Sequence, residues 1–315
     1  MFLTTKVAVI QKPPVFLDRQ RTIESILVSI DETVAEGASL LVFPEAYIPG
    51  YPTWIWRLRP GGDMALSGEI HARLRENSVD LARRDLQAVQ DAAAKHHVTI
   101  VLGINELDSQ FSGTTLFNTV VVIGPDGAIL NRHRKLMPTN PERMVWGRGD
   151  ATGLRVVETP AGRLGSLICW ESYMPLARYA LYAQDIDLYV APTWEASDSW
   201  LATMRHVAKE AGCWVIGTAT AVQGSDLPGD FPERDRLFDP KEWINDGNAV
   251  VVKPMGSVVA GPLSRVRGVL YAEIDKEEAR RARRSLDVCG HYARPDIFSF
   301  SVDRRPLPPV IFSDG

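Results

Sequence analysis

The chain is poor in cysteine, and the few cysteines that it has are scattered. Only three occur, Cys169, Cys213 and Cys289. An odd number without a close pair excludes a disulfide framework and the common zinc motifs, in which cysteines stand near one another. No metal-ligand cluster or phosphate-binding glycine loop accompanies them. The sequence therefore predicts a protein that needs no metal and no organic cofactor.

Long apolar runs and an excess of one charge are also missing. No stretch reaches the roughly eighteen apolar residues of a membrane-spanning helix, and the N-terminus lacks the basic and apolar regions of a secretory signal. Acidic residues outnumber basic ones, 39 to 35, and give a formal net charge of -4. Such a chain offers no broad basic surface to nucleic acid. We therefore expect a cytoplasmic protein that binds neither membranes nor nucleic acid.

The sequence does contain an alternation of short β-branched runs and longer helical patterns. Apolar residues that recur at three- and four-residue steps predict helices. The turn sequence 124–127 lies between two strand-like runs, 116–123 and 128–134, and predicts a hairpin. Further strands are expected at 7–10, 40–43, 99–104, 163–168, 188–191, 214–218, 249–252, 257–260 and 269–274, and helices at 23–34, 79–93, 175–182, 201–211 and 276–285.

No linker, composition break or internal repeat divides the chain. Strands that alternate with helices, together with a hairpin, predict one α/β domain with a mixed sheet covered by helices. We place this domain at 5–277. Residues 278–315 are then a C-terminal helix and an extended tail, rich in proline and aromatic residues. The segments 53–78 and 224–243 are the expected long surface insertions.

Cys169 is the candidate nucleophile. It follows the apolar run 164–168 and precedes a helix that begins near Pro175, so it lies at a strand-to-helix turn. Free N–H groups and the positive end of a helix dipole at such a turn favour the thiolate, the reactive form of cysteine. The alternative is a small core residue. Cys213 has no polar neighbour and is assigned to the core, and Cys289 receives no role.

Two ionisable residues hold matching positions. Glu45 follows the strand 40–43, and Lys135 follows the strand 129–134. Functional groups gather at the carboxyl ends of strands in open α/β sheets. The alternative for each is an exposed charge, with Lys135 as part of the basic cluster 132–135. Cysteine, glutamate and lysine together supply a nucleophile, a proton relay and a cation for developing negative charge.

Three segments carry a specific resemblance. Residues 43–52 (FPEAYIPGYP), 133–147 and 169–176 (CWESYMPL) resemble the glutamate, lysine and cysteine segments of nitrilases, in the order typical of the carbon–nitrogen hydrolase superfamily. The resemblance extends from about Lys6 to Asp296. Ser172 departs from the pattern, since many relatives carry asparagine there. That position has no catalytic role.

This resemblance implies a four-layer α-β-β-α sandwich with Glu45, Lys135 and Cys169 as the catalytic triad. Glu142 matches a second glutamate that helps to hold the lysine and the substrate. The implied reaction converts a small-molecule nitrile, with water as co-substrate, to the carboxylic acid and ammonia through a covalent thioimidate and thioester on Cys169. The family also implies a homo-oligomer, a dimer or a larger assembly such as a spiral, with the tail in subunit contacts.

The triad alone does not separate nitrilases from amidases and carbamoylases. Trp170-Glu171 after the nucleophile and the tail segment 290–296 (GHYARPD) resemble the nitrilase branch. An N-acyltransferase, which would pass the thioester to an amine, and a non-catalytic α/β interaction protein are further alternatives.

Aromatic residues near the motif segments are candidates to line an apolar substrate pocket, although aromatic side chains close to a site often belong to the core. The candidates are Tyr51, Trp54, Trp146, Trp170 and Trp194. The sequence does not select among aliphatic, aromatic and arylaliphatic nitriles.

Overall fold

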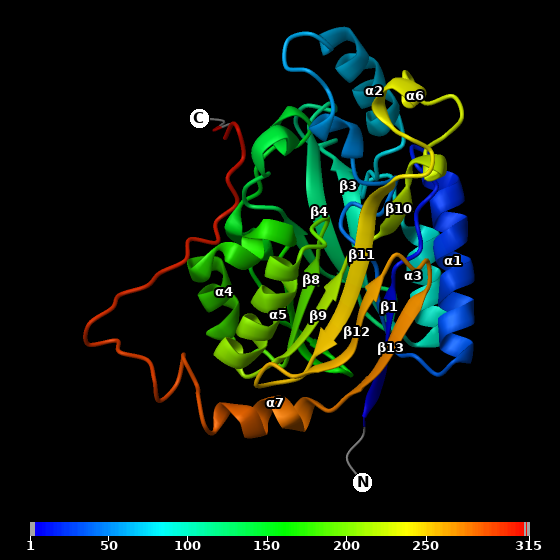
Figure 1. The fold of residues 1–315 in the computed structure, drawn as a ribbon. Coiled ribbons are helices and arrows are strands. Elements are labelled where there is room, and N and C mark those ends of the chain that lie inside the picture. The colour runs from blue at the N-terminus through cyan, green and yellow to red at the C-terminus, as the bar shows by residue number, and fades with distance from the viewer. Residues whose placement is uncertain (1–3, 312, 314–315) are drawn as a thin grey trace.

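The computed structural model describes residues 4–311 and 313. Residues 1–3, which enter the signal-peptide argument, and residues 312 and 314–315 of the predicted tail lie outside this part. Two mixed β-sheets pack face to face, and helices cover the outer face of each sheet (Figure 1). The predicted four-layer α-β-β-α sandwich is confirmed.

The first sheet has six strands in the order β13-β1-β2-β3-β4-β5. The strands β1, β2 and β3 run parallel, and the other neighbours pair antiparallel. Two helices, α1 (Arg19–Ala35) and α3 (Gln87–His96), pack on its outer face. The strands are β1 (Thr5–Ile10), β2 (Leu40–Val42), β3 (Thr99–Leu107), β4 (Leu116–Ile123), β5 (Ile129–Arg134) and β13 (Val269–Ile274).

The second sheet has the order β10-β11-β9-β8-β7-β6, with β12 paired to β11. Its central strands β7, β8 and β9 run parallel. Two helices, α4 (Pro175–Tyr182) and α5 (Asp198–Ala211), cover its outer face. The strands are β6 (Val157–Thr159), β7 (Gly162–Ser166), β8 (Leu188–Pro192), β9 (Trp214–Thr218), β10 (Ala221–Gln223), β11 (Trp243–Val252) and β12 (Val258–Ser264).

The interior between the sheets follows from strand alternation. Val7 and Val9 of β1 point toward the second sheet, whereas Ala8 and Ile10 point toward the helices of the first. A strand buried on both faces reads as a continuous apolar run, which explains why these strands are recognisable in the sequence.

The helix predicted at 79–93 is wrong in its first half, because α3 begins only at Gln87. Val79 instead forms a bridge with Glu106 of β3. The Asp80 carboxylate then accepts the backbone N–H of Ala82, and a turn follows. Val79 is fully buried, so the prediction that its side chain faces the core is confirmed. The predicted helical backbone at this residue is wrong.

The two predicted surface insertions keep many residues exposed, Met64 among them. They also bury apolar side chains in a shared cluster that includes residues outside the insertions, such as Phe16 and Trp146. They lie together beyond the carboxyl ends of the parallel strands (Figure 1). Trp54, Ile70, Phe231 and Phe238 are buried against one another. The insertions contain the short helices η1 (Thr53–Trp56) and η5 (Gly224–Asp226) and the helices α2 (Met64–Glu76) and α6 (Arg234–Leu237).

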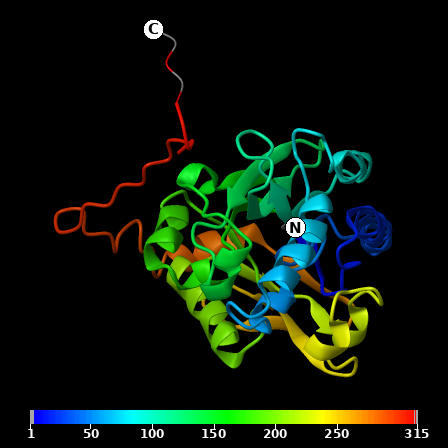
Figure 2. The same ribbon diagram turned by 90° about the horizontal axis from the view of Figure 1, so that it is seen from above.

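After the helix α7 (Lys276–Arg283), the tail first loops away from the sandwich (Figure 2). Its residues 306–309 return to the body and lie near β5. Within the described part of the tail, no further helix or strand follows α7. Across residues 4–311 and 313, no helix is both long enough and apolar enough to cross a membrane.

Candidate active site

Three strands bring the candidate residues to one edge of the sandwich. Glu45 follows β2, Lys135 follows β5 and Cys169 follows β7. Strands β2 and β5 run in the same direction, since β2 is parallel to β3 and two antiparallel steps lead from β3 to β5. The Lys135 Nζ lies 2.9 Å from Glu45 Oε1, so residues ninety positions apart meet here.

The loop that carries Glu45 is shaped by β3. A Cβ atom at Gly103 would lie 2.2 Å from the Pro44 carbonyl oxygen, so only glycine permits this approach. The Asn105 amide, two residues further, donates hydrogen bonds to the carbonyls of Ile48 and Gly50, each at 3.1 Å. The strand therefore fixes the loop through close packing and hydrogen bonds.

The charged centre contains two carboxylates and one ammonium group. Lys135 Nζ donates to Glu45 Oε1 at 2.9 Å and to Glu142 Oε2 at 2.8 Å. Asn118 Nδ2 donates to Glu45 Oε1 at 2.6 Å, and the Tyr51 hydroxyl donates to Glu142 Oε1 at 2.7 Å. These side chains are buried, so removing one partner would leave an uncompensated charge away from water.

Burial raises the pKa of Glu45, while the Lys135 ammonium opposes this shift and Glu142 adds to it. Burial alone would lower the pKa of Lys135, but the negative charges around it, that of Glu45 first, outweigh burial and raise that pKa. Lys135 is therefore a permanent cation. Glu45 Oε2 is buried and has no hydrogen-bond partner in the described structure, so its lone pairs are available to accept a proton.

Cys169 begins the short 3-10 helix η4 (Cys169–Tyr173) with a left-handed φ of 54°. Strained backbone of this kind is common where a nucleophile is presented at the end of a strand. Burial, reinforced by Glu45, raises the pKa of the Cys169 thiol to about 12, although Lys135 opposes the shift. The argument that the turn favours the thiolate is wrong, because burial and carboxylate charge outweigh a single short helical turn.

The Cys169 side chain opens into a cavity of about 210 Å³. The rings of Tyr51 and Trp194 stack in parallel at its wall, with centroids 4.3 Å apart. Trp170 lies half-exposed at the rim. The lining residues are Tyr51, Trp56, Thr139, Glu142, Cys169, Trp170, Trp194 and Glu195.

The other two aromatic candidates, Trp54 and Trp146, lie outside this lining. Trp54 is buried and packs against Phe231, with ring centroids 5.6 Å apart. Trp146 donates from Nε1 to Asn105 Oδ1 at 2.9 Å and meets Tyr51 edge-on. Trp146 therefore supports the Tyr51 side of the cavity wall from the core, whereas Trp54 belongs to the apolar cluster around Phe231.

The sequence reasoning missed Trp56, Glu195 and Asn118. Which side chain of the short helix η1 faces the cavity depends on its packing, so Trp56 could not be distinguished from Trp54 by position. Asn118 did carry a signal, since an amide in the mostly apolar strand β4 needs a buried partner.

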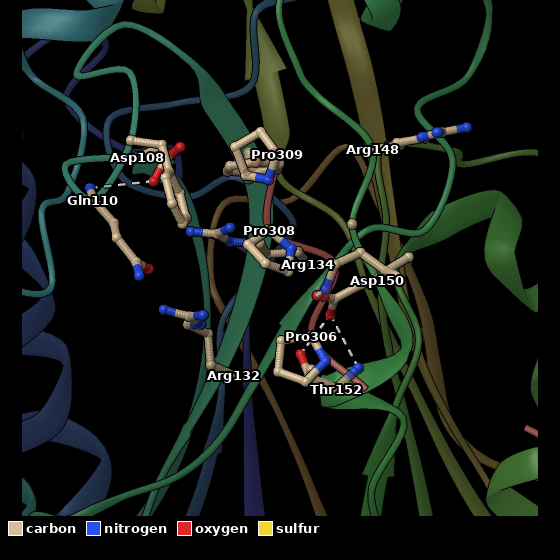
Figure 3. Close-up of a pocket in the computed structure, with 14 residues that line it drawn as sticks. Asp108, Gln110, Arg132, Arg134, Arg148, Asp150, Thr152, Pro306, Pro308 and Pro309 are labelled. Atoms are coloured by element: carbon tan, nitrogen blue, oxygen red, sulfur yellow. Dashed lines mark hydrogen bonds between the residues drawn. The ribbon is translucent and has the colours of Figure 1, made fainter. Parts of the chain in front are cut away.

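A larger cavity of about 550 Å³ lies elsewhere, between β5 and the tail (Figure 3). Arg132 and Arg134 project into it from β5, and Pro306 and Pro308 of the tail form another wall. Both arginines contact Glu106, and no cysteine is among the lining residues. It therefore lacks the thiol that the sequence identifies as the candidate nucleophile. In the described part of the chain, no group of three or more His, Cys, Asp or Glu side chains is arranged to hold a metal ion.

Comparison with known proteins places this geometry in a family. The family model for carbon–nitrogen hydrolases matches residues 6–284. An aliphatic nitrilase of Sinorhizobium fredii is 39% identical over 307 residues, covering 97% of this chain and 98% of that protein. Nitrilase 1 of Arabidopsis thaliana is 37% identical, covering 98% of this chain and 90% of that protein.

Solved structures agree with the fold. The crystal structure of a carbon–nitrogen hydrolase from Helicobacter pylori superposes with a TM-score of 0.71 at 20% identity, covering 94% of this chain and 97% of that one. The family match spans most of the chain and includes all three strand ends described above. The chain therefore belongs to the carbon–nitrogen hydrolase family.

Proposed function

We propose that this protein is a nitrilase, which converts an organic nitrile and two water molecules to a carboxylic acid and ammonia. Its catalytic residues are Glu45, Lys135 and Cys169, with Glu142 holding the lysine. The observation that carries this proposal is the buried Glu45–Lys135–Glu142 network next to a thiol that opens into a small aromatic cavity. The names of the bacterial and plant relatives support the nitrile as substrate.

The first half-reaction forms a carbon–sulfur bond. Because the Cys169 thiol is protonated at neutral pH, a base must remove its proton, and the free Oε2 of Glu45 accepts it. The sulfur attacks the nitrile carbon while one π bond of the C≡N group breaks. The nitrogen takes the proton back from Glu45, and the Lys135 ammonium stabilises its developing negative charge. The product is a thioimidate.

The second half-reaction consumes two waters. Glu45 takes a proton from the first water, whose oxygen adds to the thioimidate carbon, and transfers protons to the nitrogen until the C–N bond breaks and ammonia leaves. A thioester remains on Cys169. The second water adds in the same way, the C–S bond breaks, and the sulfur regains its proton as the acid leaves.

An amidase of the same family is the alternative, and it would start from the amide without passing through the thioimidate. We expect kcat/KM for a small nitrile to exceed that for its cognate amide by about tenfold or more, equivalent to about 1.4 kcal/mol of transition-state preference. The cavity of about 210 Å³ suits small substrates, since drug-sized ligands occupy roughly 300 Å³ or more.

The measurement is acid and ammonia release from a series of aliphatic, aromatic and arylaliphatic nitriles and from their amides. Turnover of amides without turnover of any nitrile would replace the proposal with an amidase. Transfer of the acyl group to an added amine at the expense of acid would indicate the N-acyltransferase.

We further propose that the protein is a homodimer or a larger homo-oligomer with the tail in subunit contacts. The tail contacts its own chain sparsely, for example through Phe300 against Tyr179 with ring centroids 5.5 Å apart. Tyr292, Ile297 and Phe298 are largely exposed, and Figure 2 shows this segment away from the sandwich. Exposed apolar surface of this kind is typical of protein contacts, and isologous dimers are the commonest soluble assembly.

Truncation before Gly290 tests the assembly. We expect sedimentation velocity to show smaller particles than the full-length chain forms, together with lower nitrile hydrolysis, because the truncated subunit loses its apolar contact segment. A full-length protein that sediments as a monomer at micromolar concentration and is fully active would contradict this expectation.

A further inference from the structure

Glu171 lies fully buried two residues after Cys169, and its carboxylate bonds to two separate backbone segments. Glu171 Oε2 accepts the backbone N–H of Ile168 at 2.7 Å. Glu171 Oε1 accepts the backbone N–H of Leu136 at 2.8 Å. Ile168 immediately precedes Cys169, and Leu136 immediately follows Lys135. One carboxylate thus holds the chain next to both the nucleophile and the catalytic cation.

The two segments belong to different sheets. Lys135 follows β5 of the first sheet, and Cys169 follows β7 of the second. The strand ladders stay within each sheet, so they do not set the separation between these strand ends. The Glu171 carboxylate crosses between the sheets at this edge, where it can fix that separation.

His133 completes the arrangement. It lies on β5, two residues before Lys135, which directly follows the strand, so both side chains point to the same side. Its Nε2 lies 3.1 and 3.0 Å from the two carboxylate oxygens of Glu171, and both side chains are fully buried. Burial acts to raise the pKa of Glu171, but His133 and the backbone N–H groups outweigh it and lower that pKa, so the carboxylate is ionised.

We propose that Glu171 is a positioning residue that, with His133, fixes the Cys169 thiol relative to the Lys135 ammonium. This inference rests on the proposed function of the same site. The sulfur must reach the substrate carbon while Lys135 reaches the nitrogen, and a misplacement of about 1 Å can cost on the order of a hundredfold in rate. Glu171 is not among the residues that line the cavity, so its loss acts on the chemical step more than on substrate binding.

Glu171→Gln is the main test. Glutamine has nearly the same shape but keeps one acceptor oxygen, so its NH₂ group faces a backbone N–H and one of the two links is lost. We expect kcat to fall by on the order of a hundredfold with little change in KM. Glu171→Asp keeps the charge but is one methylene shorter, and it should lower kcat similarly because it cannot reach both segments.

Asp187→Asn is the matched control. Asp187 is a buried carboxylate that accepts the backbone N–H of Arg163 at 3.0 Å and pairs with Arg283, at the opposite end of the second sheet. All three variants should lower the melting temperature, since each loses a buried charge interaction. Only the Glu171 variants should lower kcat at a temperature where circular dichroism shows every protein folded.

A folded Glu171→Gln or Glu171→Asp protein with the kcat of Asp187→Asn would overturn the proposal. So would the failure of both Glu171 variants to fold while Asp187→Asn folds, because the role of Glu171 would then be structural. A wild-type protein that hydrolyses amides but not nitriles would overturn the proposed function alone. The same comparison would then be made with the amide, since Cys169 and Lys135 need the same alignment for it.

Discussion

We expect Cys169→Ala to abolish nitrile hydrolysis while the fold stays intact. A methyl group cannot form the thioimidate, so the reaction loses its covalent route entirely. The sulfur lines a cavity and its removal mainly enlarges existing space, so we expect little loss of stability. The measurement is acid and ammonia release over many hours, with circular dichroism of both proteins.

Cys213→Ala and Cys289→Ala are the controls for this experiment. Cys213 is fully buried between the second sheet and its helices, so its replacement should cost on the order of 1 kcal/mol of unfolding free energy and leave kcat nearly unchanged. Cys289 is half-buried in the tail, and its replacement should also leave kcat nearly unchanged. Acid production by the Cys169→Ala protein at a rate near that of the wild type would exclude the covalent mechanism.

The layered fold was predictable because the strands carry their own signal. The continuous apolar run of β1 and the turn 124–127 between β4 and β5 are local features. The prediction of a helix over 79–93 failed in its first half because apolar spacing indicates which residues are buried, not which backbone conformation they adopt. A helix would bury Val79, and so does the observed β-bridge followed by a turn. Local sequence does not tell these two backbones apart.

The position of Lys135 could be predicted from the sequence, but its environment could not. Asn131, His133 and Lys135 alternate with more exposed residues along β5 and its end, so Lys135 points inward despite the basic cluster around it. Its partner Glu45 stands ninety residues earlier in the chain. The degree of burial and the sum of these charges depend on the assembled fold.

The same reason explains the error about the Cys169 thiol. A strand-to-helix turn is a local feature that favours the thiolate, and it was the only electrostatic influence visible in the sequence. Burial and the Glu45 carboxylate act in the opposite direction, and together they dominate. A thiol of high pKa requires a base beside it, so the correction strengthens the part that Glu45 plays in the proposed reaction.

Glu45→Gln should therefore change two properties in opposite directions. Glutamine Oε1 can still accept from Asn118 and Lys135, and its NH₂ group replaces Oε2, which has no partner in the described structure, so the fold should survive. Loss of the base should lower kcat by on the order of a hundredfold or more.

The thiol of this Glu45→Gln protein should nevertheless ionise more easily. The negative charge of Glu45 raises the thiol pKa and the Lys135 ammonium lowers it, so removing the first brings the pKa below about 12. Iodoacetamide should then alkylate Cys169 at lower pH than in the wild type. Glu210→Gln, the same change at a half-buried glutamate on α5, should alter neither property. A near-normal kcat in Glu45→Gln would mean that Glu142, the other carboxylate bonded to Lys135, carries the proton relay. An unchanged pH dependence of alkylation would show that Glu45 does not control the pKa of the thiol.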